Sequence, residues 1–254
     1  MDKFCSIIIT HWSMNGERSE MLKASLRSLF TSTSYPFELI VIDNGGSDSD
    51  SKFLSGLCEQ GKINTYIRNA NNMSFGYARN QGLALAQGDY ICISDNDLLY
   101  KKGWLEESVR LLEAFPEEKI YTTPIHYPTN IMRERYNVGE LELDGVKYQK
   151  NMRAGSNCFI ARRKDFEHLG GFMTHRIAGS RWTDNAVREG YSALVIPGEL
   201  VEDLGLRKGY NLGQWVPLRI KLSNGKEVFF NSDEGKDICN TEGFTQRRFN
   251  GTLQ

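Results

Sequence analysis

The chain has 254 residues, 40% of them hydrophobic, so it is long enough to bury one substantial core. Its formal net charge of −1 gives no reason to expect broad attraction to nucleic acid or to an anionic membrane surface. The sequence contains no run of 18 apolar residues, so it predicts no membrane span.

The five cysteines are scattered and are never spaced as C-x-x-C. This pattern is typical of a reduced protein with neither a disulfide framework nor a zinc site. The N-terminal residues lead directly into a strand-like run, without the longer apolar region of a secretory signal. We therefore expect a cytoplasmic protein.

The first hundred residues alternate predicted strands with predicted helices. In chain order they are a strand at 6–10, a helix at 19–30, a strand at 37–42, a helix near 53–57, a strand at 63–67, a helix at 75–87 and a strand at 90–93. Such alternation predicts right-handed crossover connections and a mainly parallel sheet, in which ligands bind beyond the carboxyl ends of the strands. Thr10–His11, Asp43–Asn44 and Asp95–Asp97 all follow strands at that edge, so we expect them to share a site.

The second half is less regular. A helix is predicted at 103–115, a strand at 120–123, a strand at 158–161, a short helix through Phe166 and Leu169, a helix at 182–189 and a strand at 192–196. We expect 124–152 to be an irregular insertion with a small hairpin around Asp144-Gly145. Near the C-terminus, the Asn-Gly pair at 224–225 predicts a hairpin of 216–222 with 227–230, followed by a polar, loosely held tail.

The triplet Asp95-Asn96-Asp97 directly follows a short apolar run, Tyr90–Ile93, that is typical of a buried strand. Two carboxylates this close cannot both be buried unpaired, because each buried charge would be costly. They must face solvent, pair with a cation or bind a metal, and hard oxygen ligands suit Mg²⁺ or Mn²⁺. A simple polar turn is the alternative, since Asp and Asn are common turn formers.

Several motifs occur in an order that is familiar from one enzyme family. They are the strand 6–10, the loop D-N-G-G-S-D at 43–48, the segment 71–82 with Ala78-Arg79-Asn80-Gln81-Gly82, the D-x-D triplet at 95–97, the segment 155–172, and Thr183-Asp184 ahead of Arg188-Glu189-Gly190-Tyr191. Together they resemble the family 2 glycosyltransferases over roughly residues 4–210.

The resemblance implies a GT-A fold, a Rossmann-like α/β architecture whose mainly parallel sheet is flanked by helices. It would occupy residues 1–212, with a nucleotide-binding half at about 1–100 and an acceptor half at about 101–212. Residues 213–254 would form a C-terminal hairpin extension and tail.

The implied reaction moves one sugar from a nucleoside diphosphate sugar, with UDP favoured, to a hydroxyl of a glycan, lipid-linked or protein acceptor. Asp97 is the first candidate to bind Mn²⁺ or Mg²⁺, with Asp95 touching the ribose or a metal-bound water. Asp184 is the candidate general base, a role that contributes about 10²–10⁴-fold. A single base without a protein nucleophile implies inversion.

Further residues take roles by their place in the motifs. The nucleotide-sugar contacts would be Thr10, His11, Asp43, Asn72, Arg79, Asp95 and Asn96, and the acceptor contacts would be Ser156, Asn157 and Thr183. Asp43 would accept a hydrogen bond from a base N–H, which suits uracil or thymine. Arg79 would either pair with phosphate or hold the D-x-D loop.

Other roles remain open for some of these residues. Asp43 could cap the following segment, and Asp184 could be a surface carboxylate in the first turn of its helix. Trp12 could be a core residue or stack on the ligand. His126, His168 and His175 have no spacing that suggests a partner.

The sequence departs from the family pattern in four respects. Thr183 stands where the family commonly has Glu, and Thr10-His11-Trp12-Ser13 replaces the usual Pro-x-Tyr-Asn. Val201–Gly205 lies where related enzymes often place a metal-binding His, so Asp203 would be a third metal ligand or part of a solvated acidic loop. The Q-x-x-R-W motif of processive synthases is missing, which favours one sugar per encounter.

Three other classes compete with a transferase. A catalytically idle relative would use the same pocket only to bind a nucleotide sugar or a glycan. A nucleotidyltransferase would show a glycine-rich basic loop after the first strand, and an NAD-dependent enzyme would show G-x-G-x-x-G there. The segment 11–18 is neither. The oligomeric state is left open by the sequence.

Overall fold

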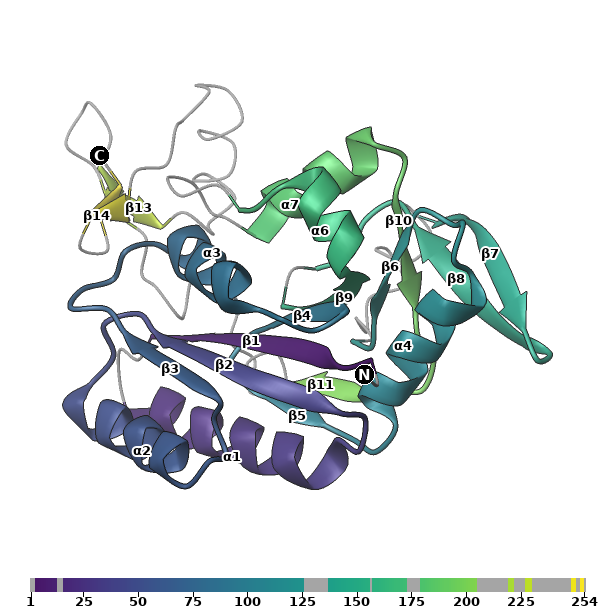
Figure 1. The fold of residues 1–254 in the computed structure, drawn as a ribbon. Helices are drawn as coiled ribbons and strands as arrows, with labels where there is room; N and C mark the ends of the chain where they lie inside the picture. Colours follow the sequence, from purple (N-terminus) through teal and green to yellow (C-terminus); the bar gives the residue numbers. More distant parts are fainter. Residues whose placement is uncertain are drawn as a thin grey trace.

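The computed structural model describes residues 3–12, 16–125, 137–155, 157–172 and 179–204, and the backbone of four short strands beyond them. Within this part of the chain a nine-stranded sheet forms the centre of the molecule (Figure 1). From one edge to the other its strands are β3 (Thr65–Arg68), β2 (Phe37–Asp43), β1 (Cys5–His11), β4 (Tyr90–Ser94), β9 (Cys158–Arg162), β6 (Ile120–Thr123), β10 (Ser192–Val195), β8 (Val146–Asn151) and β7 (Asn137–Leu143).

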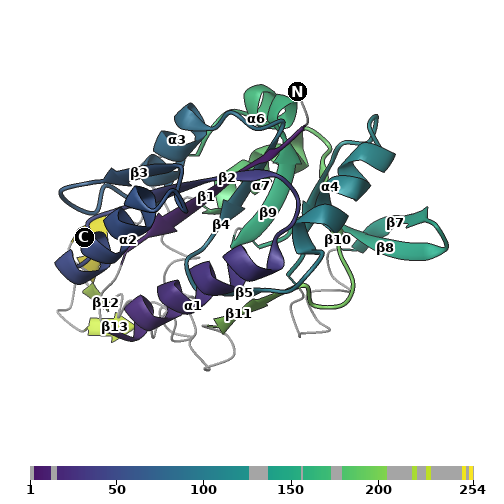
Figure 2. The ribbon, with the colours of Figure 1, turned by 60° about the horizontal axis from the view of Figure 1, so that its bottom comes forward.

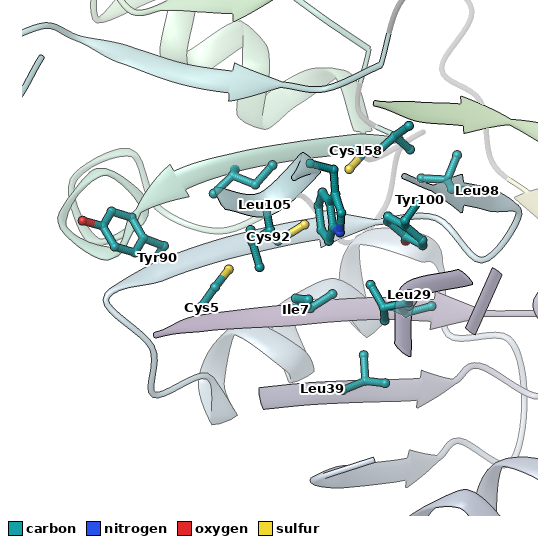
Figure 3. Packing of buried hydrophobic residues seen from close by; sticks show 14 of the residues in the cluster. Cys5, Ile7, Leu29, Leu39, Tyr90, Cys92, Leu98, Tyr100, Leu105 and Cys158 are labelled. Atoms are coloured by element: carbon teal, nitrogen blue, oxygen red, sulfur yellow. The ribbon is translucent and has the colours of Figure 1, made fainter. Parts of the chain in front are cut away.

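Helices cover both faces of this sheet (Figures 1 and 2). One face carries α1 (Gly16–Ser32), α2 (Asp48–Glu59) and α4 (Trp104–Ala114), and the other carries α3 (Phe75–Leu85), α6 (Arg163–Leu169) and α7 (Gly179–Arg188). The hydrophobic core is therefore divided into two clusters by the sheet. Figure 3 shows part of the first cluster, where Ile7, Cys92 and Leu105 pack together.

The α/β prediction is confirmed, and the sheet is mixed. Strands β3, β2, β1 and β4 run parallel to one another. Strand β9 then inserts antiparallel between β4 and β6, and β8 and β7 continue antiparallel beyond β10. The parallel part thus coincides with the predicted nucleotide-binding half, where the alternation of strands and helices is clearest.

The small hairpin expected around Asp144-Gly145 is confirmed, and residues 137–151 are regular where an irregular insertion was expected. Residues 137–151 form the β7–β8 hairpin, and its two turn residues, Asp144 and Gly145, have φ of 52° and 77°. Positive φ at both positions is typical of the tight hairpin turn that was predicted around these residues. The hairpin projects beyond the helices (Figure 2), so most of its side chains are exposed and its sequence shows little alternation.

Two short strands have no counterpart in the sequence analysis. β5 (Leu98–Tyr100) and β11 (Val201–Asp203) pair antiparallel and place Asp203 opposite Leu98. Three residues are too few to show a strand period, which explains why Val201–Gly205 looked like an acidic loop.

The C-terminal hairpin is confirmed by the antiparallel pairing of β12 (Arg219–Lys221) with β13 (Glu227–Phe229), although its turn lies outside the described residues. The tail, expected to be loose, contributes β14 (Arg248–Phe249) and β15 (Thr252–Leu253) to the same small sheet. The predicted boundary at 212 lies outside the described residues. Among the helices of the described chain, none combines the length and the apolar character needed to cross a membrane.

Candidate functional site

The acidic triplet lies at the carboxyl end of β4, between the beginning of β9 and the end of β11. The Asp95 amide donates to the Asn157 carbonyl over 2.8 Å, and the Leu204 amide donates to the Asp97 carbonyl over 2.9 Å. The side-chain amide of Asn157 also donates to an Asp203 carboxylate oxygen over 3.0 Å. Three segments that are far apart in sequence are thereby joined around Asp95, Asp97 and Asp203.

Arg79 supports the triplet from helix α3. Its guanidinium lies 3.0 Å from the Asp95 carboxylate and 3.9 Å above the Phe75 ring. The side chain is buried, and burial lowers the pKa of Arg79 to about 10, so the group remains protonated at neutral pH. Of its two predicted roles, this position supports holding the D-x-D loop.

The carboxylates are crowded and incompletely compensated. Burial raises the pKa of Asp97 to about 8, with further increases from the charges of Asp95 and Asp203. Burial likewise raises the pKa of Asp95 to about 6, although Arg79 opposes the shift. A group of carboxylates that resists ionisation is stabilised by a bound cation, because the cation removes the mutual repulsion.

A divalent cation shared with a substrate needs oxygen ligands, which the acidic triplet contains. Within the described segments, no three His, Cys, Asp or Glu side chains are arranged to hold a metal by themselves. A Mg²⁺ or Mn²⁺ ion shared with substrate phosphates needs only one or two protein carboxylates. Asp97, with Asp95 and Asp203 close enough to raise its pKa, fits such a shared site.

His11 is buried at the end of β1, and both nitrogens of its ring contact protein groups. Its Nδ1 lies 2.6 Å from the Asn96 side-chain nitrogen, and its Nε2 lies 3.1 Å from an Asp50 carboxylate oxygen. The Ser19 hydroxyl donates to the same Asp50 oxygen over 2.9 Å. Burial lowers the pKa of His11 despite the Asp50 carboxylate.

Asp43 is buried, and its carboxylate already holds its own loop together. One oxygen accepts the Gly46 amide over 2.7 Å, and the other accepts the hydroxyls of Ser51 and, over 3.0 Å, Tyr66. A hydrogen bond to a nucleobase would require part of this arrangement to open. Thr10 is buried too, and its hydroxyl makes no hydrogen bond within the described residues.

Asn44 fixes the loop that precedes α3. Its side chain donates to the Asn72 side-chain oxygen over 3.0 Å and accepts from the Asn69 side chain and the Met73 amide, each over 3.0 Å. Asn72 itself is exposed at the edge of the predicted nucleotide site. Among the residues predicted to contact the nucleotide, Asn72 is therefore exposed and accessible to a ligand.

The candidate base Asp184 lies on α7 with its side chain 34% exposed. It forms an ion pair with Arg153, whose Nη2 lies 2.9 Å away. The Tyr121 hydroxyl accepts the neighbouring Ala154 amide over 3.0 Å, which fixes this segment next to α7. Thr183 is buried and faces the core, and Ser156 lies outside the described residues.

Two residues that interact with the site, Asp50 and Arg18, were not singled out by sequence reasoning. Asp50 lies in the run of polar residues 43–50, which contains three other aspartates or asparagines and gives no sign of its contact with His11. Arg18 lies in the first turn of α1. Its charge lowers the pKa values of Asp95 and Asp97, and so opposes the increases caused by burial and by the neighbouring carboxylates. A cation in the first turn of a helix is unfavourable to the helix dipole, and this is the sequence signal that could have pointed to Arg18.

Comparison with known proteins identifies the family. The model of "Glycosyl transferase family 2" matches residues 6–170. A glucosyl-dolichyl phosphate glucuronosyltransferase of Haloferax volcanii is 25% identical over 114 residues, which cover 44% of this chain and 35% of that protein. The amylovoran biosynthesis glycosyltransferase AmsB of Erwinia amylovora is 28% identical over 123 residues, or 46% of this chain and 39% of that protein. The matches thus span well under half of each relative.

Two solved structures have a similar fold at low sequence identity. The mannosyltransferase PcManGT of Pyrobaculum calidifontis, in complex with GDP-Man and Mn²⁺, gives a TM-score of 0.63 at 19% identity and covers 81% of this chain and 58% of that chain. GalNAc-T7 with UDP, GalNAc and Mn²⁺ gives 0.63 at 15% identity, covering 84% and 44%. The fold is therefore the GT-A fold, and because the family model matches well over half of the sequence, the chain belongs to glycosyl transferase family 2.

Proposed function

We propose that this chain transfers one sugar from a nucleoside diphosphate sugar to an acceptor hydroxyl, with inversion at the anomeric carbon and with the help of a divalent cation. The observation that carries the proposal is the cluster of Asp95, Asp97 and Asp203 at the carboxyl end of the parallel strands. Burial and mutual repulsion raise the pKa values of Asp95 and Asp97. In a parallel α/β sheet this edge is where ligands bind.

The donor half of the reaction concerns the leaving diphosphate. Asp97 would hold the Mg²⁺ or Mn²⁺ ion, with Asp95 or Asp203 as a second oxygen ligand. When bound, the ion stabilises the negative charge that develops on the diphosphate as the sugar leaves. Arg79 would keep Asp95 in place from below, since its guanidinium is buried against that carboxylate.

In the acceptor half of the reaction, a base must take the proton of the attacking hydroxyl. Asp184 would accept the proton of the attacking hydroxyl, and its partial exposure gives an acceptor access to the carboxylate. Arg153 would have to leave Asp184, or share it, when an acceptor binds. Asn157, Ser156 and Thr183 remain proposed acceptor residues; the burial of Thr183 supports an indirect role through the packing of α7.

UDP is the first choice by the resemblance, yet the two Mn²⁺-containing structural neighbours hold different nucleotides, GDP-Man and UDP. The Asp43 carboxylate, expected to select uracil, is occupied by its own loop. We propose a nucleoside diphosphate sugar as the donor class, a glycan, lipid-linked or protein acceptor, and a cytoplasmic site of action.

The first experiment is a thermal-shift panel of UDP, GDP, dTDP and CMP, each with and without Mn²⁺. A ligand present at 100 times its dissociation constant adds about 2.7 kcal/mol to the native state. We expect one nucleoside diphosphate to stabilise the wild type only with metal, and Asp97→Ala to abolish the effect. Asp144→Asn, which neutralises an exposed carboxylate in the β7–β8 turn, is the control. No shift with any nucleotide would remove the basis of the proposal.

A catalytically idle relative is the second candidate. The observation that favours it is the Arg153–Asp184 ion pair, because the guanidinium occupies a carboxylate oxygen that would otherwise face the acceptor hydroxyl. Such a protein would bind a nucleotide sugar with metal but would release neither free sugar nor glycosylated product. Consumption of the donor, measured as release of the nucleoside diphosphate, distinguishes the two candidates. The transferase consumes the donor, whereas the idle relative does not.

A further inference from the structure

A row of buried polar groups connects helices α1 and α2 to the acidic triplet. Ser19 on α1 donates to Asp50 on α2, and the same Asp50 oxygen lies 3.1 Å from His11 Nε2. On the other side of the ring, His11 Nδ1 lies 2.6 Å from the Asn96 side-chain nitrogen. His11 and Asp50 are 0% and 1% exposed, so solvent does not weaken these contacts.

The contacts determine the protonation of the ring. An amide nitrogen can only donate, so His11 Nδ1 accepts from Asn96 and carries no proton. The single ring proton is then on Nε2, where it is donated to the Asp50 carboxylate. This is a neutral imidazole, in agreement with the lowered pKa that burial gives to His11.

A neutral acceptor is well suited to this position. Asp95, Asp97 and Asp203 repel one another, so their loop needs a bond that holds it in place. A second cationic side chain beside Arg79 could do this, but it would also neutralise carboxylates that a metal must bind. The imidazole holds Asn96, the uncharged member of the triplet, and adds no charge.

We propose that His11 is a positioning residue that sets the conformation of the Asp95-Asn96-Asp97 loop through Asn96, with Asp50 orienting its ring. The inference rests on the proposed function, since it assigns His11 to metal and donor binding through the loop and not to contact with the nucleotide. The ring is fully buried, and it bridges the triplet to α2.

Two substitutions of His11 each remove one of the two hydrogen bonds that its ring makes. In His11→Asn the amide oxygen can take the place of Nδ1 and accept from Asn96, but the contact with Asp50 is lost. In His11→Gln the amide nitrogen can take the place of Nε2 and donate to Asp50, but the acceptor for Asn96 is lost. His168→Gln changes an exposed histidine on α6 and is the matched control.

The experiment measures Mn²⁺ binding to the full chain by the loss of the free-ion EPR signal, with donor kcat and KM where turnover is found. Loss of groups that orient metal ligands typically weakens metal binding by about 10–100-fold. We expect that loss in His11→Gln, with donor KM raised more than kcat is lowered, and recovery of most of the affinity in His11→Asn. His168→Gln should bind Mn²⁺ like the wild type.

A double-mutant cycle and a spectrum complete the test. Asn96→Leu should weaken Mn²⁺ binding, and adding it to His11→Gln should cost little more, because both remove the same bond. Equal Mn²⁺ affinity in wild type and His11→Gln would overturn the inference. If the wild type binds no Mn²⁺, the proposed function fails, and the ¹⁵N resonances of the His11 ring then decide the inference separately. It stands if they show a neutral Nε2–H ring that Asn96→Leu perturbs, and it falls otherwise.

Discussion

The guanidinium of Arg79, a residue of α3, lies 3.0 Å from the carboxylate of Asp95, which directly follows β4. Arg79 is buried, and its charge opposes the rise in the pKa of Asp95 that burial causes. Removing one partner of a buried pair leaves the other charge uncompensated, which costs more than the pair itself contributes.

Because the Asp95 side chain is 29% exposed and so partly solvated, we expect Arg79→Leu to lower the free energy of unfolding by less than the about 3–5 kcal/mol typical of a fully buried pair. Arg79→Lys should lose less, because it keeps the charge and gives up only the planar contact with Phe75. Urea unfolding of the metal-free protein measures both changes. A loss in Arg79→Leu as small as that in Arg79→Lys would show that Asp95 does not depend on this charge.

The stability of the metal-free protein should decrease as the pH rises. In the folded state the pKa values of Asp95 and Asp97 are raised to about 6 and about 8, whereas an unfolded Asp titrates near 3.9. The folded state thus holds more protons than the unfolded chain between these values, so its stability falls as pH rises from about 4 through 8.

The measurement is the urea midpoint in EDTA from pH 5 to 8.5. Asp97→Asn should remove the part of the decrease near pH 8, whereas Asp144→Asn should leave the profile unchanged. Adding Mg²⁺ should stabilise the wild type more at pH 8 than at pH 6, because a metal competes with protons for the carboxylates. Identical pH profiles for wild type and Asp97→Asn would contradict the assignment.

Asp203 and Glu202 are neighbours on β11 and therefore point to opposite sides of the strand. Asp203 accepts from Asn157 and its charge raises the pKa values of Asp95 and Asp97. We expect Asp203→Asn to weaken Mn²⁺ binding, since it removes a candidate oxygen ligand and part of the attraction for the ion. Glu202→Gln is the matched control and should bind Mn²⁺ like the wild type; equal binding by both variants would leave Asp203 without a metal role.

The glycines of α3 and α2 offer a second matched pair. A Cβ on Gly82 would lie 2.4 Å from Ile8 Cγ2, whereas a Cβ on Gly56 meets nothing within 4 Å. Gly82→Ala should therefore push α3 away from β1 and cost about 1–3 kcal/mol, while Gly56→Ala should stabilise the protein by up to about 1 kcal/mol. Thermal unfolding measures both, and a neutral Gly82→Ala would mean that α3 can shift freely.

Sequence reasoning was most informative where strand and helix alternate. The strands that end at His11, at Asp43 and just before Asp95 are largely buried and form continuous apolar runs, so the polar residues at their ends could be placed at one edge of the sheet. The GT-A fold followed from the order of these motifs, and the structure confirms it.

The parts that were missed depend on contacts between distant segments. The β5–β11 pair joins residues a hundred positions apart, and neither strand is long enough to be recognised alone. The burial of His11 and Asp43 could not be inferred from their motifs, which describe residue order and not side-chain surroundings. Their predicted contacts with the nucleotide remain predictions, and the structure adds the internal bonds that compete with them.

The last prediction concerns the chemical step. Asp184→Asn should lower kcat by about 10²–10⁴-fold, because the amide cannot accept the acceptor's proton, and it should leave the affinity for the donor unchanged. Transfer to an acceptor that supports turnover, together with nucleotide binding by calorimetry, measures the two effects separately. An unchanged kcat would exclude Asp184 as the base.

Arg153→Gln distinguishes loss of the base from loss of its ion pair. The pair is exposed on both sides, with 42% and 34% of the side chains accessible, so breaking it should change the free energy by only about 0–1 kcal/mol. We expect its kcat to stay within about fivefold of the wild type. A loss as large as that in Asp184→Asn would instead show that Arg153 takes part in the reaction, because its ion pair with Asp184 is too exposed to produce such an effect by itself.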